Sequence, residues 1–307
     1  IWMLTGTPMK NGRPIQLYPL LAAIDHPIAR NQKEYERLFC EVGDFGGENC
    51  LKYDFYGLSK INNFRKVISP LVLSRSKKKL INLPPIIRRK YKVNLDKLKT
   101  LGFNHRVSLV VDDYRDRVQQ GTVNPNSEAL VYLNSMRRIA SEFKLPEVSY
   151  LLSKLIARGE SVVLFSCFLQ PLYLLQKSFG GELLTGRQNL RQRKEVIENF
   201  QDERIKLLLC SFGVGGFGHT LHHAKNVILL ERPWTPGDTF QAEDRCHRIG
   251  MTGSLTSHWF QLGFADQLVD NLINEKSEKI EILLGKNQIN LERQSLALMF
   301  NKCLQLF

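Results

Sequence analysis

The segment from Gln241 to Gly250 carries the residues best suited to phosphate chemistry, in the order Gln-Ala-Glu-Asp-Arg-Cys-His-Arg-Ile-Gly. Positions i, i+3 or i+4, and i+7 share one face of a helix. Guanidinium groups bind phosphate oxygens in pairs of hydrogen bonds, and an arginine finger offsets the charge that develops on a transferring phosphoryl group. The spacing therefore predicts a phosphate-binding face formed by Gln241, Asp244 or Arg245, and Arg248. A solvent-exposed helix with ion pairs among Glu243, Asp244 and the two arginines is the alternative interpretation.

A glycine-rich loop after the apolar run Leu207–Cys210 is a second candidate for phosphate contact, because glycine lets a backbone approach phosphate closely. Gly213, Gly215 and Gly218 also match the fingerprint of a dinucleotide site. However, only the seven residues from His219 to Lys225 precede the next apolar run, and a βαβ crossover needs about ten to twelve. We therefore reject a dinucleotide site here.

The histidines and cysteines could bind a metal or form disulfides, but their spacing in the sequence does not favour either. His219, His222 and His223 have no neighbouring cysteine or carboxylate to complete a ligand set, so no metal site is expected. The six cysteines form no Cys-x-x-Cys pair, which favours a reducing, intracellular setting: the cytoplasm or nucleoid of a prokaryote, or a eukaryotic nucleus. The run Leu109–Tyr114 resembles a strand ending in acidic ligands, but we interpret it as part of an amphipathic helix.

The elements that must position these residues alternate in the second half of the chain. Short apolar runs predict strands, and a helix over 190–200 separates the first two. This alternation predicts an α/β fold, a parallel sheet with helices on both faces. The strands are expected at 161–166, 205–210, 226–230 and 256–260.

Before residue 150 the pattern changes to long amphipathic helices, such as 105–120 and 128–143, without a convincing series of strands. We predict a helical insertion subdomain over 33–150, and a further helix over 266–284.

Composition sets wider bounds. The 307 residues allow one full domain and a smaller one. An excess of 43 Lys and Arg over 30 Asp and Glu favours a polyanionic partner such as nucleic acid. No apolar run approaches the length of about 18 residues that crosses a membrane, so no membrane partner is expected. Ile1–Thr5 resembles a strand already under way, so we expect the natural start to lie upstream.

The Gln241–Gly250 segment resembles motif six of the Swi/Snf family of DNA-dependent ATPases, in helicase superfamily two. The usual form of that motif is Gln-Ala-x-Asp-Arg-x-His-Arg-Ile-Gly-Gln, and only the last position differs, being Met251 here. In that family both arginines reach the nucleotide from the second RecA-like lobe. The resemblance therefore implies that Arg245 and Arg248 are catalytic, with Gln241 and Asp244 beside the nucleotide.

Four further segments resemble family motifs in the family's order. They are Leu4–Asn11 (motif three), Val162–Phe168 (motif four), Leu207–Gly218 (motif five) and the turn Pro233–Gly237, whose form is similar to the annealing-helicase branch. The family assigns DNA contact to motif three and both DNA and nucleotide contact to motif five. The residues implied are Thr5, Gly6, Thr7, Ser166 and Ser211 for DNA, and Gly215 and Gly216 for nucleotide.

The basic run that begins at Arg75 has two interpretations. It continues through Lys77 and Lys78 and, after a gap, includes Arg88–Lys90 and Lys92, with no acidic residue from 75 to 92. A charge run is usually a solvated face. Residues 71–77 nevertheless resemble a family segment that lies near DNA, and contact with phosphates requires only cations within reach of the backbone.

The resemblance implies this arrangement: the end of a first RecA-like lobe over 1–32, an insertion and linker over 33–150, the second lobe over 151–264 and a helical brace over 265–307. The sequence contains neither a Gly-x-x-x-x-Gly-Lys-Ser/Thr loop nor an Asp-Glu box before Thr5. ATP and Mg²⁺ are therefore expected to be held mainly by a first lobe, upstream in the same polypeptide or in a separate chain, and this chain alone is expected not to hydrolyse ATP.

The partner implied is the phosphate backbone of double-stranded DNA. Two alternatives remain open: a non-catalytic DNA-binding remnant of a truncated or split motor gene, and a strand-separating helicase.

Overall fold

The computed structural model describes residues 3–5, 8–42, 53–54, 61–73, 81–122, 125–215 and 220–284. The chain divides into two compact units. Unit 1 consists of Ile1–Ile81, Thr235–Gly237 and Leu272–Leu291, and unit 2 of Asn82–Trp234, Asp238–Asn271 and Glu292–Phe307. Within the described part of the chain, no helix is both long and apolar enough to cross a membrane.

Unit 1 is built from short helices around an aromatic core. The ring centroids of Tyr18 and Tyr35 are 5.3 Å apart, those of Tyr35 and Phe39 5.0 Å, and those of Phe39 and Phe64 5.4 Å, all in edge-to-face contact. The buried hydroxyl of Tyr35 donates to the carbonyl of Pro14 over 2.8 Å, which satisfies the one polar atom of that ring. The elements are η1 (Pro14–Leu17), α1 (Tyr18–Ala23), η2 (Pro27–Ala29), α2 (Gln32–Phe39), α3 (Ile61–Ile68) and the antiparallel pair β1 (Glu41–Val42) and β2 (Tyr53–Asp54).

Unit 2 contains a parallel sheet of six strands, in the order β3-β8-β7-β4-β6-β5. Its central strands are covered on both faces, so they consist of nearly uninterrupted apolar residues, as parallel sheets require. The strands are β3 (Ile86–Lys92), β4 (Val162–Ser166), β5 (Glu182–Leu184), β6 (Leu207–Ser211), β7 (Asn226–Leu229) and β8 (Leu255–Gln261). The predicted α/β fold with a parallel sheet is confirmed.

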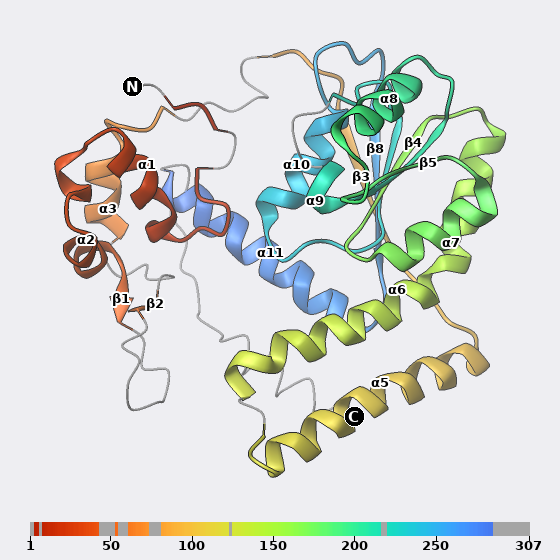
Figure 1. Cartoon of the computed structure of the whole chain (residues 1–307), viewed down its shortest axis with the longest axis horizontal. Coiled ribbons are helices and arrows are strands. Elements are labelled where there is room, and N and C mark those ends of the chain that lie inside the picture. The colour runs from red at the N-terminus through yellow and green to blue at the C-terminus, as the bar shows by residue number, and fades with distance from the viewer. Residues whose placement is uncertain are drawn as a thin grey trace. The chain divides into compact units, whose positions relative to one another are not determined.

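Helices pack on both faces of this sheet (Figure 1). Val196 and Phe200 of α8 and Ala242 and Cys246 of α10 join the core on one face, while α6 and α7 cover the other. The helices of unit 2 are α5 (Lys97–Gln119), α6 (Pro125–Ala157), α7 (Leu169–Phe179), α8 (Leu190–Gln201), α9 (Phe212–Gly215) and, from Asp238 onward, α10 (Pro236–Cys246). Helix α11 (Gly263–Leu283) begins in unit 2 and ends in unit 1.

Strand β3 lies inside the stretch over which no convincing strands were expected. It pairs in parallel with β8 from Ile86 opposite Leu255 to Lys92 opposite Gln261. Four of its seven residues are Lys or Arg, which hides the apolar pattern of a strand. Such charges are tolerated because β3 is at the edge of the sheet, where charged side chains also discourage pairing with other chains.

Helix α6 also departs from the sequence-based expectation, because it continues to Ala157 with Pro146 inside it. Proline removes a hydrogen bond from a helix interior, so the expected helix stopped at 143. The residues after Pro146 are nevertheless held by burial, since Val148 and Leu152 are 0% exposed. Packing within unit 2 therefore outweighs the tendency of proline to end a helix.

Candidate functional site

The arginine-bearing segment forms helix α10 and the turn after it. Thr239, Ala242, Glu243 and Cys246 face the protein interior, whereas Asp244 is exposed and Gln241, Arg245 and Arg248 are half-buried. The outward face thus holds the residues that the spacing singled out. The helix ends at Cys246, so Arg248 lies in the following turn, where the Met251 amide donates to the Arg248 carbonyl over 3.2 Å.

The two guanidiniums are close enough to influence each other. Burial and the positive charge of Arg248 lower the pKa of Arg245, and Asp244 opposes this effect. Two neighbouring cations on a half-buried surface favour an anion that bridges them, because it would relieve their repulsion.

Two residues that follow the glycine-rich loop in the sequence, Thr220 and Leu221, bind these arginines. The Leu221 amide donates to the carbonyl of Arg245 over 2.8 Å, and Arg248 Nη1 donates to Thr220 Oγ1 over 2.8 Å. On the other side of the loop, β6 ends at Ser211 and α9 ends at Gly215. Residues 216–219, including Gly216, lie outside the described residues. The structure therefore brings Thr220 and Leu221, which follow the predicted loop in the sequence, to the two arginines.

Glu243 is 1% exposed, so the interpretation of this residue as part of a surface ion-pair network is wrong. Its carboxylate accepts hydrogen bonds from Ser257 Oγ (2.7 Å) and Trp259 Nε1 (3.1 Å), both on β8. Arg88 on β3 also binds it, with Nη2 2.6 Å from Oε2. This carboxylate anchors the inward side of α10 to two strands.

The carboxyl ends of the central strands, where open α/β sheets bind ligands, carry a second polar group. Ser166 ends β4, and its buried hydroxyl donates to Glu231 Oε2 over 2.8 Å. The Cys167 amide donates to the same oxygen over 3.0 Å, and burial raises the pKa of Glu231. The predicted DNA contact of Ser166 stays a prediction, and in this structure its hydroxyl is engaged inside the protein.

Two buried cations, one on α6 and one just after β7, support this edge of the sheet. Lys144 Nζ donates to Asp266 Oδ2 (2.8 Å) and to the Leu230 carbonyl (2.6 Å). Arg232 binds both carboxylate oxygens of Asp270, at 2.6 and 2.7 Å. Sequence reasoning assigned no role to these residues. For Arg232, the signal that could have found it is charge at the end of an apolar run, as in Leu229-Leu-Glu-Arg232.

Arg137 on α6 joins that network to the turn before α10. Its guanidinium donates to the Arg232 carbonyl and lies 4.9 Å from the ring centroid of Trp234. The Trp234 Nε1 donates to Asn134 Oδ1 over 3.2 Å. The tryptophan of the turn Pro233–Gly237 is therefore held by α6.

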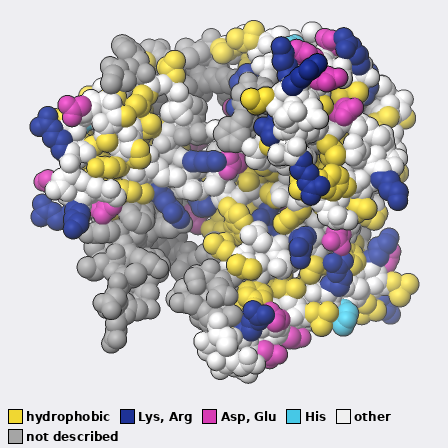
Figure 2. Space-filling model, viewed as in Figure 1, with side chains coloured by type: hydrophobic (Ala, Val, Ile, Leu, Met, Phe, Trp, Pro, Cys, Tyr) yellow, Lys and Arg dark blue, Asp and Glu magenta, His cyan; other side chains and the backbone are white. Residues whose placement is uncertain are grey.

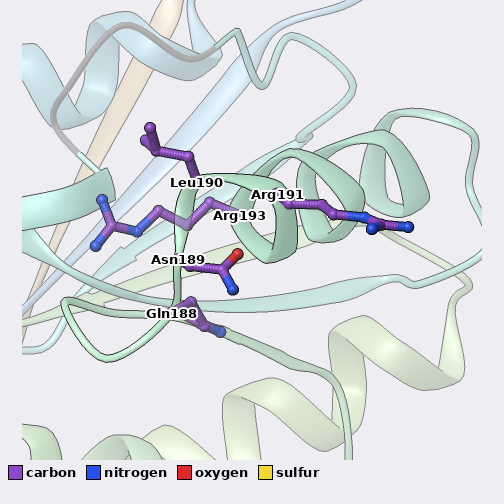
Figure 3. A pocket seen from close by; sticks show the side chains of 5 residues that line it. All are labelled: Gln188, Asn189, Leu190, Arg191 and Arg193. Atoms are coloured by element: carbon purple, nitrogen blue, oxygen red, sulfur yellow. The ribbon is translucent and has the colours of Figure 1, made fainter.

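A basic depression lies where α8 begins, and Figure 3 shows Arg191 and Arg193 pointing to opposite sides of it. Helix α8 starts with a capping box in which Asn189 and Gln192 each bind the backbone amide of the other. Arg193 Nη2 also donates to the Gly186 carbonyl over 3.3 Å. The depression is lined by Gln188, Asn189, Leu190, Arg191 and Arg193.

Several predicted site residues cannot be placed with the others. Gly6, Thr7, Arg75, Lys77 and Lys78 lie outside the described residues, and Thr5 is exposed in unit 1.

The described histidines of the loop bind protein groups. His222 Nδ1 is 3.0 Å from Gln201 Nε2, and His223 Nε2 is 3.3 Å from Glu203. In the described ranges no three His, Cys, Asp or Glu side chains gather to hold a metal ion.

Two family models match the chain, one after the other. The SNF2-related domain matches residues 1–145, and the helicase conserved C-terminal domain matches residues 144–250.

Curated relatives match over long stretches. The DNA annealing helicase and endonuclease ZRANB3 of Bos taurus is 25% identical over 289 residues, which is 90% of this chain and 26% of that protein. The transcription regulatory protein SNF2 of Saccharomyces cerevisiae is 25% identical over 284 residues, 81% of this chain and 16% of that protein. This chain thus spans about a quarter of the first relative's length and less of the second's.

Solved structures share the fold. The C-terminal part of the Fun30 ATPase domain matches with a TM-score of 0.53 at 16% identity, over 74% of this chain and all of that one. The Sulfolobus solfataricus SWI2/SNF2 ATPase core in complex with double-stranded DNA matches with a TM-score of 0.51 at 21% identity, over 85% of this chain and 58% of that one. The α/β unit is therefore a RecA-like lobe.

Proposed function

Because the chain belongs to the Snf2 family of helicase superfamily two, we propose that it is the C-terminal part of an ATP-dependent translocase on double-stranded DNA, with Arg245 and Arg248 as its arginine fingers. The observation that carries this proposal is the pair of neighbouring guanidiniums at the end of the glycine-rich loop, where the charge of Arg248 helps to lower the pKa of Arg245. A γ-phosphate between them would satisfy both cations.

The residues of this chain fit one side of a nucleotide. Half-buried cations suit the phosphoryl group as its negative charge grows, while the sequence has no P-loop lysine and no Asp-Glu box for Mg²⁺. ATP and Mg²⁺ would therefore be held mainly by a first lobe. When bound, the nucleotide supplies the phosphoryl group that is transferred to water. Arg245 and Arg248 would stabilise the charge on that group, and Gln241 and Asp244 lie on the same outward side of α10.

The DNA partner would be contacted through its phosphates. Ser211 and Gly215 flank the loop that leads to the arginines, and this continuity would couple the DNA track to the nucleotide. Thr5–Thr7 and the basic run at Arg75, Lys77 and Lys78 would add contacts. The similarity to an annealing helicase over 90% of this chain favours reannealing of duplex DNA as the outcome of translocation.

The test is DNA-stimulated ATP turnover by the protein that includes the first lobe. Arg245→Ala and Arg248→Ala should each lower kcat by about 10³- to 10⁵-fold, the usual effect of removing an arginine finger. The KM for ATP should change little, since another lobe holds the phosphates.

Arg204→Ala is the matched control for this experiment. Arg204 is an exposed arginine whose Nη2 pairs with Asp202 over 2.9 Å on the protein surface, so its loss should leave turnover unchanged. Full turnover by both finger variants would refute the assignment.

A further inference from the structure

The inward side of α10 is tied to the first residues of unit 2. Arg88 on β3 donates to Glu243 from Nε (3.1 Å) and Nη2 (2.6 Å). His247, just after the helix, donates from Nε2 to the Pro84 carbonyl over 2.6 Å. Pro84 and Arg88 lie shortly after Asn82, where the chain enters unit 2. Two contacts therefore connect this entry segment to the segment that bears the arginines.

The Arg88 contact is specific because of where Glu243 lies. The Glu243 side chain is 1% exposed, whereas the Arg88 side chain is 43% exposed. An ionised carboxylate is buried at an acceptable cost only when a cation and hydrogen bonds compensate it. Ser257 and Trp259 supply hydrogen bonds but no charge, so Arg88 supplies the cation. Its guanidinium also lies 5.6 Å from the ring centroid of Phe240, another residue of α10.

The position of Glu243 on α10 lets the contact with Arg88 control the orientation of the helix. Residues two apart on an α-helix are separated by about 200°, so Glu243 points away from the side that holds Gln241 and Arg245. Holding Glu243 inward therefore fixes the rotation of α10 about its axis. The His247 contact fixes the chain beside Arg248 in the same way.

We infer that Arg88 is a positioning residue: through Glu243 it fixes the rotation of α10 and so directs the arginine fingers. The inference rests on the proposed function of Arg245 and Arg248. It assigns Arg88 a role within the protein, whereas the sequence left it as part of a solvated or DNA-facing basic run.

The first test separates positioning from stability. In the protein with its first lobe, Arg88→Met should lower kcat by about tenfold or more with little change in the KM for ATP, because misplaced groups act mainly on the transition state. Arg88→Met/Glu243→Gln removes the buried charge together with its partner, so the urea midpoint should return toward that of the wild type while kcat stays low. Recovery of kcat along with stability would overturn the inference.

Arg106→Met is the matched control. Arg106 binds Glu142 over 2.7 Å on α5 and α6, and its side chain is 44% exposed, close to the value for Arg88. This variant loses an Arg–Glu pair that does not touch α10, so kcat should not change. If Arg106→Met lowered kcat as much as Arg88→Met does, loss of an Arg–Glu pair anywhere in the unit would lower turnover, and the specific role of Arg88 would be refuted.

A second measurement does not depend on ATP turnover. In residues 1–307, hydrogen exchange at the amides of α10 should be faster in Arg88→Met than in wild type, and unchanged in Arg106→Met. Unchanged exchange in α10 would overturn the inference. If Arg245→Ala and Arg248→Ala both keep full turnover, the proposed function fails. If Arg245→Ala is inactive while both Arg88 variants keep wild-type kcat, the proposed function stands and only the positioning role falls.

Discussion

The two arginines proposed to act together are held by different means. Arg245 is in the last turn of α10, and its direction follows the rotation of that helix. Arg248 lies beyond the helix and is held by Thr220 Oγ1 at the end of the loop. A movement of the segment that contains Thr220 would therefore displace mainly the Arg248 side chain, whereas a rotation of α10 would displace mainly the Arg245 side chain.

A second residue, His258 on β8, should make the stability of unit 2 depend on pH. It is 3% exposed, and its ring lies between Asn226 Oδ1, 3.0 Å from Nε2, and the Tyr91 hydroxyl, 2.9 Å from Nδ1. Asn226 Nδ2 donates to Glu160, so its Oδ1 is the acceptor and the His258 proton lies on Nε2. Burial, and then the charge of Arg89, lower the pKa of His258 to about 4.

We expect this histidine to destabilise the fold in acid. Its folded pKa lies below its unfolded value of about 6.5, so the unfolded state takes up the proton first and stability falls as pH drops from about 6.5 toward 4. Between pH 7 and pH 5 the loss should be roughly 2 kcal/mol. Urea unfolding at both pH values should show this loss in wild type and a smaller one in His258→Gln. The exposed His105→Gln should keep the wild-type difference, and equal losses in all three proteins would contradict the prediction.

Among the elements, α8 shows how local sequence alone can specify a boundary. Asn189 Oδ1 accepts from the Gln192 amide over 2.9 Å, and Gln192 Oε1 accepts from the Asn189 amide over 3.0 Å. These bonds satisfy amides that a helix start would otherwise leave unpaired. The helix observed over Leu190–Gln201 agrees with the predicted 190–200 to within one residue.

Asn189→Ala should therefore lower the free energy of unfolding by about 1 kcal/mol, the usual effect of losing an N-cap side chain. Denaturant unfolding at neutral pH measures it. Lys194→Ala, in the middle of the same helix with its ammonium 3.7 Å from Glu198, should change the free energy by less than about 0.5 kcal/mol. A cap variant as stable as this control would show that α8 is held by packing alone.

For the molecule as a whole, charge is the property most open to experiment. The net charge is +13, and Figure 2 shows Lys and Arg side chains on both units, including a group over α8. Binding to phosphates releases counterions, so affinity falls as salt rises, whereas contacts with bases would depend on sequence.

We expect two duplexes of equal length and unrelated sequence to bind equally well. Their affinity should fall about 10³-fold or more between 50 and 200 mM salt if about six or more phosphates are contacted. Fluorescence anisotropy at a series of salt concentrations measures both quantities. A strong preference for one duplex, or an affinity that does not respond to salt, would contradict phosphate-based binding.

The sequence by itself was sufficient for the parallel α/β fold, for four of the six strands of the parallel sheet and for the outward face of α10. Those features follow from local patterns: apolar runs of strand length, helical spacing, and motifs whose residues are neighbours along the chain. The segments 226–230 and 256–260, for example, were predicted as strands and are observed as β7 (Asn226–Leu229) and β8 (Leu255–Gln261).

Only the tertiary structure decided which charges are buried and what they bind. Glu243 and Arg88 are far apart in the sequence, and each lies in a run that the sequence suggests is solvent-exposed. Arg88 reaches Glu243 because β3 pairs in parallel with β8, whose residues Ser257 and Trp259 hold the carboxylate of Glu243 on α10. The same holds for Arg137, Lys144 and Arg232, whose partners come from other elements. Local spacing cannot reveal such pairs, because the low dielectric of the interior that makes them important arises only when distant segments pack.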